Sequence, residues 1–277
     1  MSTVTVSQRA RLSGWRPYVH DLWSRREFAW FLAMGNLKAR NASTGLGLFW
    51  WVLNPVLMSA VYFVAFGIIF KGRRADPEFL AWLLSGMFAF NYTATAMTSG
   101  ANSIIGNRNL LVNIRFPRLI FPITGLIETG IGFLASLGVY YVIVWPTNGV
   151  RPSSSLVWLP VAIVLHTAFN MGIAAFVARL AVPIRDVNNL IPHLNRMWLY
   201  LSPIIWPITL LDDLPSLAQR VIEANPMFVI LSVYRAALMG RQLEASDVWL
   251  TAFWAAIALV AGVLSFVRYE GNMVRHL

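Results

Sequence analysis

Three ionisable side chains lie near the middle of long apolar stretches, where a charge is expensive if the stretch crosses a membrane. They are Glu128, His166 and Arg196. Glu128 and Arg196 each lie nine residues from the same predicted face, a depth of about 13 Å at ~1.5 Å per residue. The matched depth predicts an ion pair between two spans. Such a pair would be either purely structural or a polar point on a translocation path.

Other kinds of chemistry find little support in the residues. The chain has no cysteine, its four histidines show no zinc-type spacing, and no G-x-x-x-x-G-K-[ST] loop is present to hold a nucleotide phosphate. Asp212-Asp213 is an isolated acidic pair. We therefore expect no catalytic residue, no cofactor and no metal in this chain. We also expect that the chain by itself is not an enzyme.

The composition indicates a membrane protein. The 277 residues are 57% hydrophobic and only 12% charged, whereas soluble domains carry roughly 25% charged residues. The net charge of +10 fits the excess of basic residues in cytoplasmic loops and attraction to anionic membrane lipids. A nucleic-acid partner is the alternative, but the basic residues are spread over loops and form no single patch. We expect contact with membrane lipids and no nucleic acid.

The apolar stretches predict an all-α polytopic membrane protein with a single domain over residues 1–277. A helix needs about 20 apolar residues to cross a bilayer, and the sequence offers six such transmembrane helices. They cover residues 46–70, 79–98, 119–144, 156–182, 187–206 and 248–267. The six-helix membrane region is therefore 46–267. Residues 1–22 would form a polar arm, disordered or loosely laid on the surface, and 268–277 a short basic tail.

Two segments outside the spans have amphipathic patterns. Residues 23–43 place Phe28, Phe31 and Leu32 at helical spacing between polar sides, which predicts an N-terminal helix lying in the membrane interface. Its alternative is a docking element for a cytosolic partner. Residues 102–115 predict a second, short amphipathic helix at the membrane surface.

The region 207–240 is irregular. Its apolar pieces are too short to cross and are separated by Leu214-Pro215 and Asn225-Pro226. At membrane depth, broken backbone survives only when it is buried in protein or lines a wet cavity. We expect re-entrant external half-helices between spans five and six, with a folded extramembrane loop as the alternative.

The basic residues predict the orientation. With six spans, fourteen Lys and Arg fall on the side of the termini and seven on the other. The majority side is cytoplasmic by the positive-inside rule, so both termini should be cytoplasmic. The cluster Lys71-Arg73-Arg74 on the outer side violates the rule. The first strongly apolar segment begins near residue 46, too late for a cleaved signal peptide.

Several aromatic residues lie inside spans rather than at their ends. Aromatic faces can pack against the C–H faces of sugars, so these side chains are candidates for lining a glycan path. Lipid contact or helix packing explains them equally well. The candidates are Tyr62, Phe66, Phe70, Phe88 and Tyr92.

A series of short motifs in one order resembles a known family. Each motif is weak alone, but their order and intervals are specific, and the likeness runs over nearly the whole chain from Trp23. The motifs are Gly45-Leu46-Gly47-Leu48-Phe49-Trp50 with Asn54-Pro55, Asn109-Leu110-Leu111, Phe116-Pro117-Arg118 with Pro122, Arg185-Asp186-Val187, Leu201-Ser202-Pro203-Ile204-Ile205-Trp206-Pro207, and Asn225-Pro226. On these residues the chain resembles the permease subunits of type-2 ABC transporters that export polysaccharides.

The resemblance implies a function and a set of partners. It implies a homodimer in the bacterial plasma membrane that exports a lipid-linked polysaccharide, such as a lipopolysaccharide O-antigen, a teichoic acid or a cell-wall galactan. The overall likeness, without any single motif, is to the actinobacterial galactan exporters. Two copies of a separate cytosolic ATPase would bind ATP and Mg and drive transport.

The resemblance also assigns candidate sites. The ATPase-coupling residues would be Asn102, Ile104, Ile105, Asn107, Arg108, Leu111, Arg25 and Arg26. The gating residues would be Ser202, Pro203, Trp206, Pro207, Asn225 and Pro226. Two alternatives stay open: an ion-coupled transporter or lipid-glycan flippase that uses Glu128, His166 and Arg196, and a membrane-embedded glycosyl or lipid transferase. The transferase would need an acidic metal or phosphate site, and none is evident.

Overall fold

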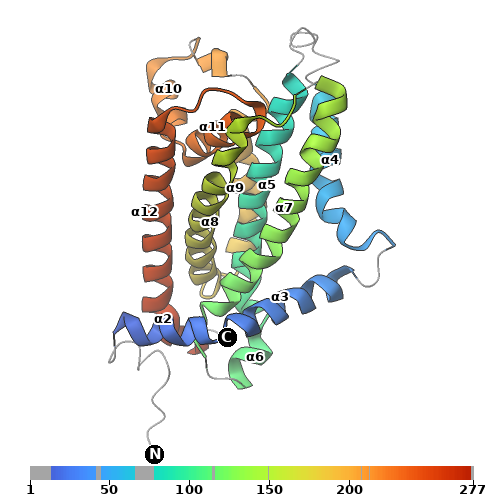
Figure 1. Ribbon diagram of the computed structural model, residues 1–277. Helices are drawn as coiled ribbons and strands as arrows, with labels where there is room; N and C mark the ends of the chain where they lie inside the picture. Colours follow the sequence, from blue (N-terminus) through green and yellow to red (C-terminus); the bar gives the residue numbers. More distant parts are fainter. Residues whose placement is uncertain are drawn as a thin grey trace, which may run out of the picture.

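The protein is a bundle of long helices with shorter helices across its two ends (Figure 1). The computed structural model describes residues 14–41, 45–65, 78–113, 116–148, 150–206, 208–211 and 213–275, and this part of the chain contains no strand. The prediction of an all-α fold is confirmed. The basic cluster at 71–74 lies outside the described residues.

Two helices lie across one end of the bundle, α2 (Trp15–Ser24) and α3 (Arg26–Asn41). The interface helix expected over 23–43 corresponds to α3. The loose arm expected over 1–22 is wrong for residues 15–22, which are helical. Tyr18 explains the difference, because it is buried and its hydroxyl donates to Glu270 Oε2 at 2.8 Å. This contact fixes α2 against the C-terminal part of the chain.

The centre of the bundle consists of α5 (Phe79–Ile105), α7 (Ile120–Asn148), α8 (Leu159–Ala181) and α12 (Ala245–Tyr269). A 3-10 turn, η3 (Ser154–Trp158), precedes α8, and η5 (Glu270–Arg275) follows α12. Small residues let these helices approach closely, as is common in membranes. A Cβ at Gly172 on α8 would collide with the α12 backbone at Ala258, and one at Gly100 on α5 would stand 2.6 Å from the carbonyl oxygen of Ala174.

Shorter elements complete the bundle. Helix α4 (Trp50–Tyr62) follows η1 (Gly47–Phe49), α6 (Arg108–Asn113) lies between α5 and α7, and α9 (Val187–Leu201) packs beside α5. At the far end from α2 and α3 come η4 (Ile208–Leu211), α10 (Ser216–Glu223) and α11 (Pro226–Met239). The predicted connector helix over 102–115 is thus divided within its described residues, because α5 continues to Ile105 and α6 is the separate piece.

Helices α10 and α11 form a pair bent by 67°. The bend follows from Asn225-Pro226: proline is accepted in the first turn of a helix, and the Asn225 side chain accepts a hydrogen bond from the Met227 N–H at 3.0 Å. Gly240, in the left-handed conformation with φ 70°, ends α11. The irregular region of the sequence is therefore two helices with a sharp break.

Apolar length identifies a multi-pass membrane protein. Among the described residues, three segments are long and apolar enough to cross a membrane: Ile120–Thr147, Ser154–Ala181 and Ala245–Met273. The bent pair α10–α11 would be a fourth. The expected six spans are not reached by this measure: α4 has 13 described residues and α9 has 15, and α5, although 27 residues long, is not among the three apolar segments. The number six stays a prediction.

Candidate functional site

A polar groove runs between α5 and α7. It is a cavity of about 460 Å³, completed by Asn36 from α3 and Asn54 from α4. Its described lining residues are Asn36, Asn54, Phe88, Asn91, Tyr92, Thr95, Thr98, Ser99, Asn102, Ser103, Asn107, Phe121, Thr124, Gly125, Glu128, Thr129, Gly132, Phe133 and Ser136. The volume falls in the range of about 300–1,000 Å³ that is usual for small-molecule sites.

Helical periodicity builds both walls of the polar groove. On α5 the lining residues Asn91, Thr95, Ser99 and Asn102 recur every three or four positions, and on α7 the lining residues from 121 to 136 do the same. Residues at this spacing share one face of a helix. The two polar faces therefore point at each other instead of at lipid.

The hydroxyl groups of the walls are bonded to their own helices. Thr95 donates to the Asn91 carbonyl at 2.7 Å, Thr124 to the Ile120 carbonyl at 2.8 Å, and Ser136 to the Gly132 carbonyl at 2.9 Å. This bond satisfies the hydroxyl proton and leaves the oxygen with lone pairs to accept further hydrogen bonds.

Glu128 belongs to the polar groove and not to an ion pair with Arg196. Its Oε1 accepts a hydrogen bond of 2.7 Å from Asn36 Nδ2, which ties α7 to α3. Both Glu128 and Arg196 are described, and no ion pair joins them. The predicted pairing is wrong because equal depth fixes only the height of a residue. Arg196 is exposed on α9 and lies near Tyr62 of α4.

His166 is a fully buried contact between three helices. Its Nε2 lies 2.7 Å from the Thr93 hydroxyl on α5, and its Nδ1 lies 3.2 Å from the Tyr234 hydroxyl on α11. Its ring also meets Tyr92 edge to face at 5.0 Å. The three ionisable residues are therefore in three different surroundings.

The aromatic candidates are divided by the fold. Phe88 and Tyr92 line the polar groove, and Tyr92 stacks on Phe133 with ring centres 4.6 Å apart. Tyr62 lies apart, against Tyr200 of α9. Phe66 and Phe70 lie outside the described residues.

The candidate gating residues come together between α9 and α11. Asn225 Oδ1 accepts from Trp198 Nε1 at 2.8 Å, and Asn225 Nδ2 donates to the Ser202 hydroxyl at 2.9 Å. Trp206 Nε1 donates to the Tyr200 carbonyl at 3.0 Å. Pro226 begins α11. Pro207 lies outside the described residues.

Arg235 on α11 joins this gating segment and was missed from the sequence. It is buried, its guanidinium lies 3.2 Å from the ring centre of Trp82 on α5, and Nη2 donates to the Pro203 carbonyl. Among the described residues, its Nε and Nη1 have no hydrogen-bond partner. The sequence feature that could have identified it is an arginine inside the apolar run 227–238. The count of basic residues on each side of the membrane assigned this arginine to an outer loop instead.

The coupling candidates do not form one surface. Ile104 and Leu111 are buried, Ile105 is partly buried, and Asn102 and Asn107 line the polar groove. Arg108, at the start of α6, is exposed.

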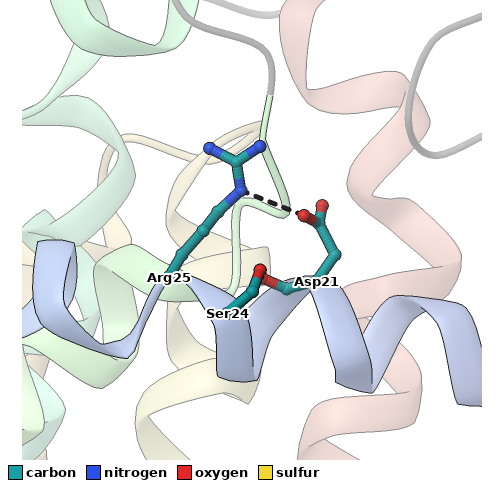
Figure 2. Close-up of polar contacts among 3 residues, drawn as sticks. All are labelled: Asp21, Ser24 and Arg25. Atoms are coloured by element: carbon teal, nitrogen blue, oxygen red, sulfur yellow. Dashed lines mark hydrogen bonds and ion pairs between the residues drawn. The ribbon is translucent and has the colours of Figure 1, made fainter.

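The remaining two coupling candidates lie where α2 meets α3. Arg25 Nε pairs with Asp21 at 3.1 Å, beside Ser24 (Figure 2). The neighbouring Arg26 is exposed and lies over the Trp23 ring. Both arginines are at the same end of the bundle as α6.

The same end holds a buried polar contact between distant parts of the chain. The Tyr18 hydroxyl and the Arg118 N–H both donate to the carboxylate of Glu270, the latter at 2.7 Å. Burial, followed by the charge of Glu270, raises the pKa of Tyr18 well above its usual value, so the phenol stays protonated as a donor. The described residues contain no cluster of three or more His, Asp or Glu that could hold a metal.

Comparisons with known proteins agree with this architecture. A family model described as ABC-2 type transporter matches residues 28–239. An O-antigen export system permease protein of Myxococcus xanthus, RfbA, is 26% identical over 229 residues, which is 83% of this chain and 86% of the relative. Two such permeases of Klebsiella pneumoniae are 26% and 24% identical over 236 residues, 85% of this chain and 89% of each relative.

Proposed function

Because the chain belongs to the ABC-2 type transporter membrane family, we propose that it is the permease subunit of an exporter of lipid-linked polysaccharide. The named relatives are O-antigen export permeases. The glycan is of the galactan, O-antigen or teichoic-acid class. The subunit works as a homodimer in the bacterial plasma membrane with both termini cytoplasmic. Two copies of a separate ATPase, which hold ATP and Mg, drive it.

The outer face of α9 is the observation that carries the proposal. His193 and Arg196 are exposed there, among the exposed apolar residues Leu190, Leu194 and Met197. An arginine facing lipid at the centre of a span costs at least about 2.5–3.5 kcal/mol. A second copy would remove this cost by placing two α9 faces around a shared wet path. The face therefore fits a channel wall between two subunits.

The cycle proceeds from the cytoplasmic end of the bundle to the external end. The ATPase docks at α6 and α3, where Arg108 and Arg26 are exposed. Helix α6 follows α5 after a two-residue turn, so a push on α6 reaches α5, which packs against α9. Asn225 then links the end of α9 to α11. The bent pair α10–α11 acts as a re-entrant external gate.

Cysteine cross-linking tests the dimer without background, because the chain has no native cysteine. Met197→Cys on α9 and Val260→Cys on α12 are matched in exposure, at 62% and 56%. Oxidation in membranes should give a disulfide-linked dimer for Met197→Cys and little for Val260→Cys. A membrane-impermeant thiol reagent should label Arg196→Cys faster than Val260→Cys. Cross-linking through α12 alone would refute the arrangement.

Complementation tests the activity. In a strain that lacks its own O-antigen permease, this chain should restore polysaccharide at the cell surface only when its partner ATPase is also expressed. Restoration without the ATPase that collapses with the proton gradient would instead indicate an ion-coupled transporter. The purified subunit should hydrolyse no ATP alone.

A further inference from the structure

The polar groove is separate from the proposed channel wall. No residue of α9 is among its described lining residues. It extends from Asn107, near α6, to Ser136 along α7, and Asn54, Thr98 and Asn102 are its exposed residues. A ligand reaching the bundle from the end that carries α3 and α6 would meet this groove within one subunit.

The chemistry of the walls matches sugar hydroxyls. Apart from Ser99, the lining threonine and serine hydroxyls already donate to carbonyls of their own helices, so they face the groove as acceptors. The amides of Asn54 and Asn91 add groups that both donate and accept. A sugar ring carries several hydroxyls, each of which donates and accepts. Phe88, Tyr92 and Phe133 line the groove as buried rings, with Tyr92 and Phe133 stacked on each other.

Other ligands fit the groove less well. A phosphate-bearing polymer is normally held by Arg or Lys, and the described lining residues include neither. An acyl chain would offer no hydrogen bond to the side-chain amides of Asn54 and Asn91, which is unfavourable. An uncharged sugar needs no basic side chain to bind it, and its hydroxyls can form hydrogen bonds with the polar groups of the walls.

We propose that the polar groove is an entry subsite that binds uncharged sugar rings of the exported glycan before they reach the channel. This inference rests on the proposed export function and narrows its substrate class to neutral glycans. Asn36, bonded to Glu128, connects the site to α3. Movement of α3 therefore alters the groove wall.

A binding experiment on the full-length protein in lipid nanodiscs tests the subsite. The probes are a neutral galactose oligosaccharide and a glycerol phosphate oligomer of similar length, with affinity measured by calorimetry. The test variant is Thr95→Val with Thr124→Val, which removes two acceptors at nearly constant shape. Thr147→Val is the matched control, because Thr147 makes the same bond to its own helix on α7 but lies outside the groove.

The neutral oligosaccharide should bind the wild type and the Thr147→Val control with similar affinity. It should bind the double variant about tenfold or more weakly than either. The glycerol phosphate oligomer should bind poorly throughout. Equal sugar binding by the double variant and the control, or tighter binding of the glycerol phosphate oligomer, would overturn the subsite. A melting temperature within error of the control guards against misfolding.

Export separates the two proposals. If the wild type restores export and the double variant does so equally well, the subsite fails while the exporter stands. If the wild type restores no export but binds the neutral sugar through the groove, the exporter fails and the sugar site stands.

Discussion

A methyl group at Gly100 should force α5 away from α8. The Cβ of an alanine there would stand 2.6 Å from the Ala174 carbonyl oxygen and 2.7 Å from its Cα, where ordinary contact begins at 3.4 Å. The shortfall requires the helices to separate by about 0.8 Å, and the neighbour is backbone that cannot rotate away. Overpacking of this kind costs roughly 2 kcal/mol. Relative to a glycine-to-alanine substitution without the clash, the melting temperature of a chain of this size should be lower by about 4–8 °C.

Gly138→Ala is the matched control, because Gly138 is also in a long helix but an added Cβ there would meet no described atom within 4 Å. Both substitutions gain about 1 kcal/mol of helix propensity, so the difference between them isolates the contact. The twelve tryptophans give a strong fluorescence signal for thermal unfolding in detergent. At Gly172 the neighbouring backbone is closer still, so Gly172→Ala should lower the melting temperature more than Gly100→Ala does. Equal melting temperatures for Gly100→Ala and Gly138→Ala would refute the reasoning.

Two further substitutions test the ends of the bundle. Tyr18→Phe removes a donor to buried Glu270 and should cost about 1–3 kcal/mol, with faster hydrogen exchange in α2; unchanged exchange would contradict the contact. Arg235→Met removes a buried cation whose Nε and Nη1 have no hydrogen-bond partner in the described part of the chain, so stability should hold or rise. A cysteine at buried Ile204 should then react faster with thiol reagents. Arg241→Met, which breaks an exposed ion pair, should leave that reactivity unchanged. Equal rates in both variants would contradict a role of the Arg235–Pro203 hydrogen bond in holding this segment.

Helix positions were predictable because apolar runs and prolines mark them locally. The spans expected over 156–182 and 248–267 correspond to α8 and α12 within a few residues. The break at Asn225-Pro226 was also predictable, because proline at a helix start and an asparagine cap are local sequence signals.

Side-chain partners were not predictable in the same way. The depth of Glu128 follows from its distance to a span end, but its partner depends on the angle at which it leaves the helix. That partner is Asn36, 92 residues away on a helix outside the spans. Arg235 was misplaced for a related reason, because counting charges per loop ignores burial within a broken helix. The polar faces of α5 and α7 had a readable spacing, but only packing shows that they face each other.

The bond between Tyr18 and Glu270 has a consequence for biosynthesis. The two residues are separated by 252 positions, and ribosomes add roughly 5–20 residues per second. Helix α2 therefore waits about 13–50 s after its own synthesis before its docking partner exists. During that interval Tyr18 has no folded surface to meet, so the nascent chain must keep this amphipathic segment against lipid or a chaperone until Glu270 has been synthesised.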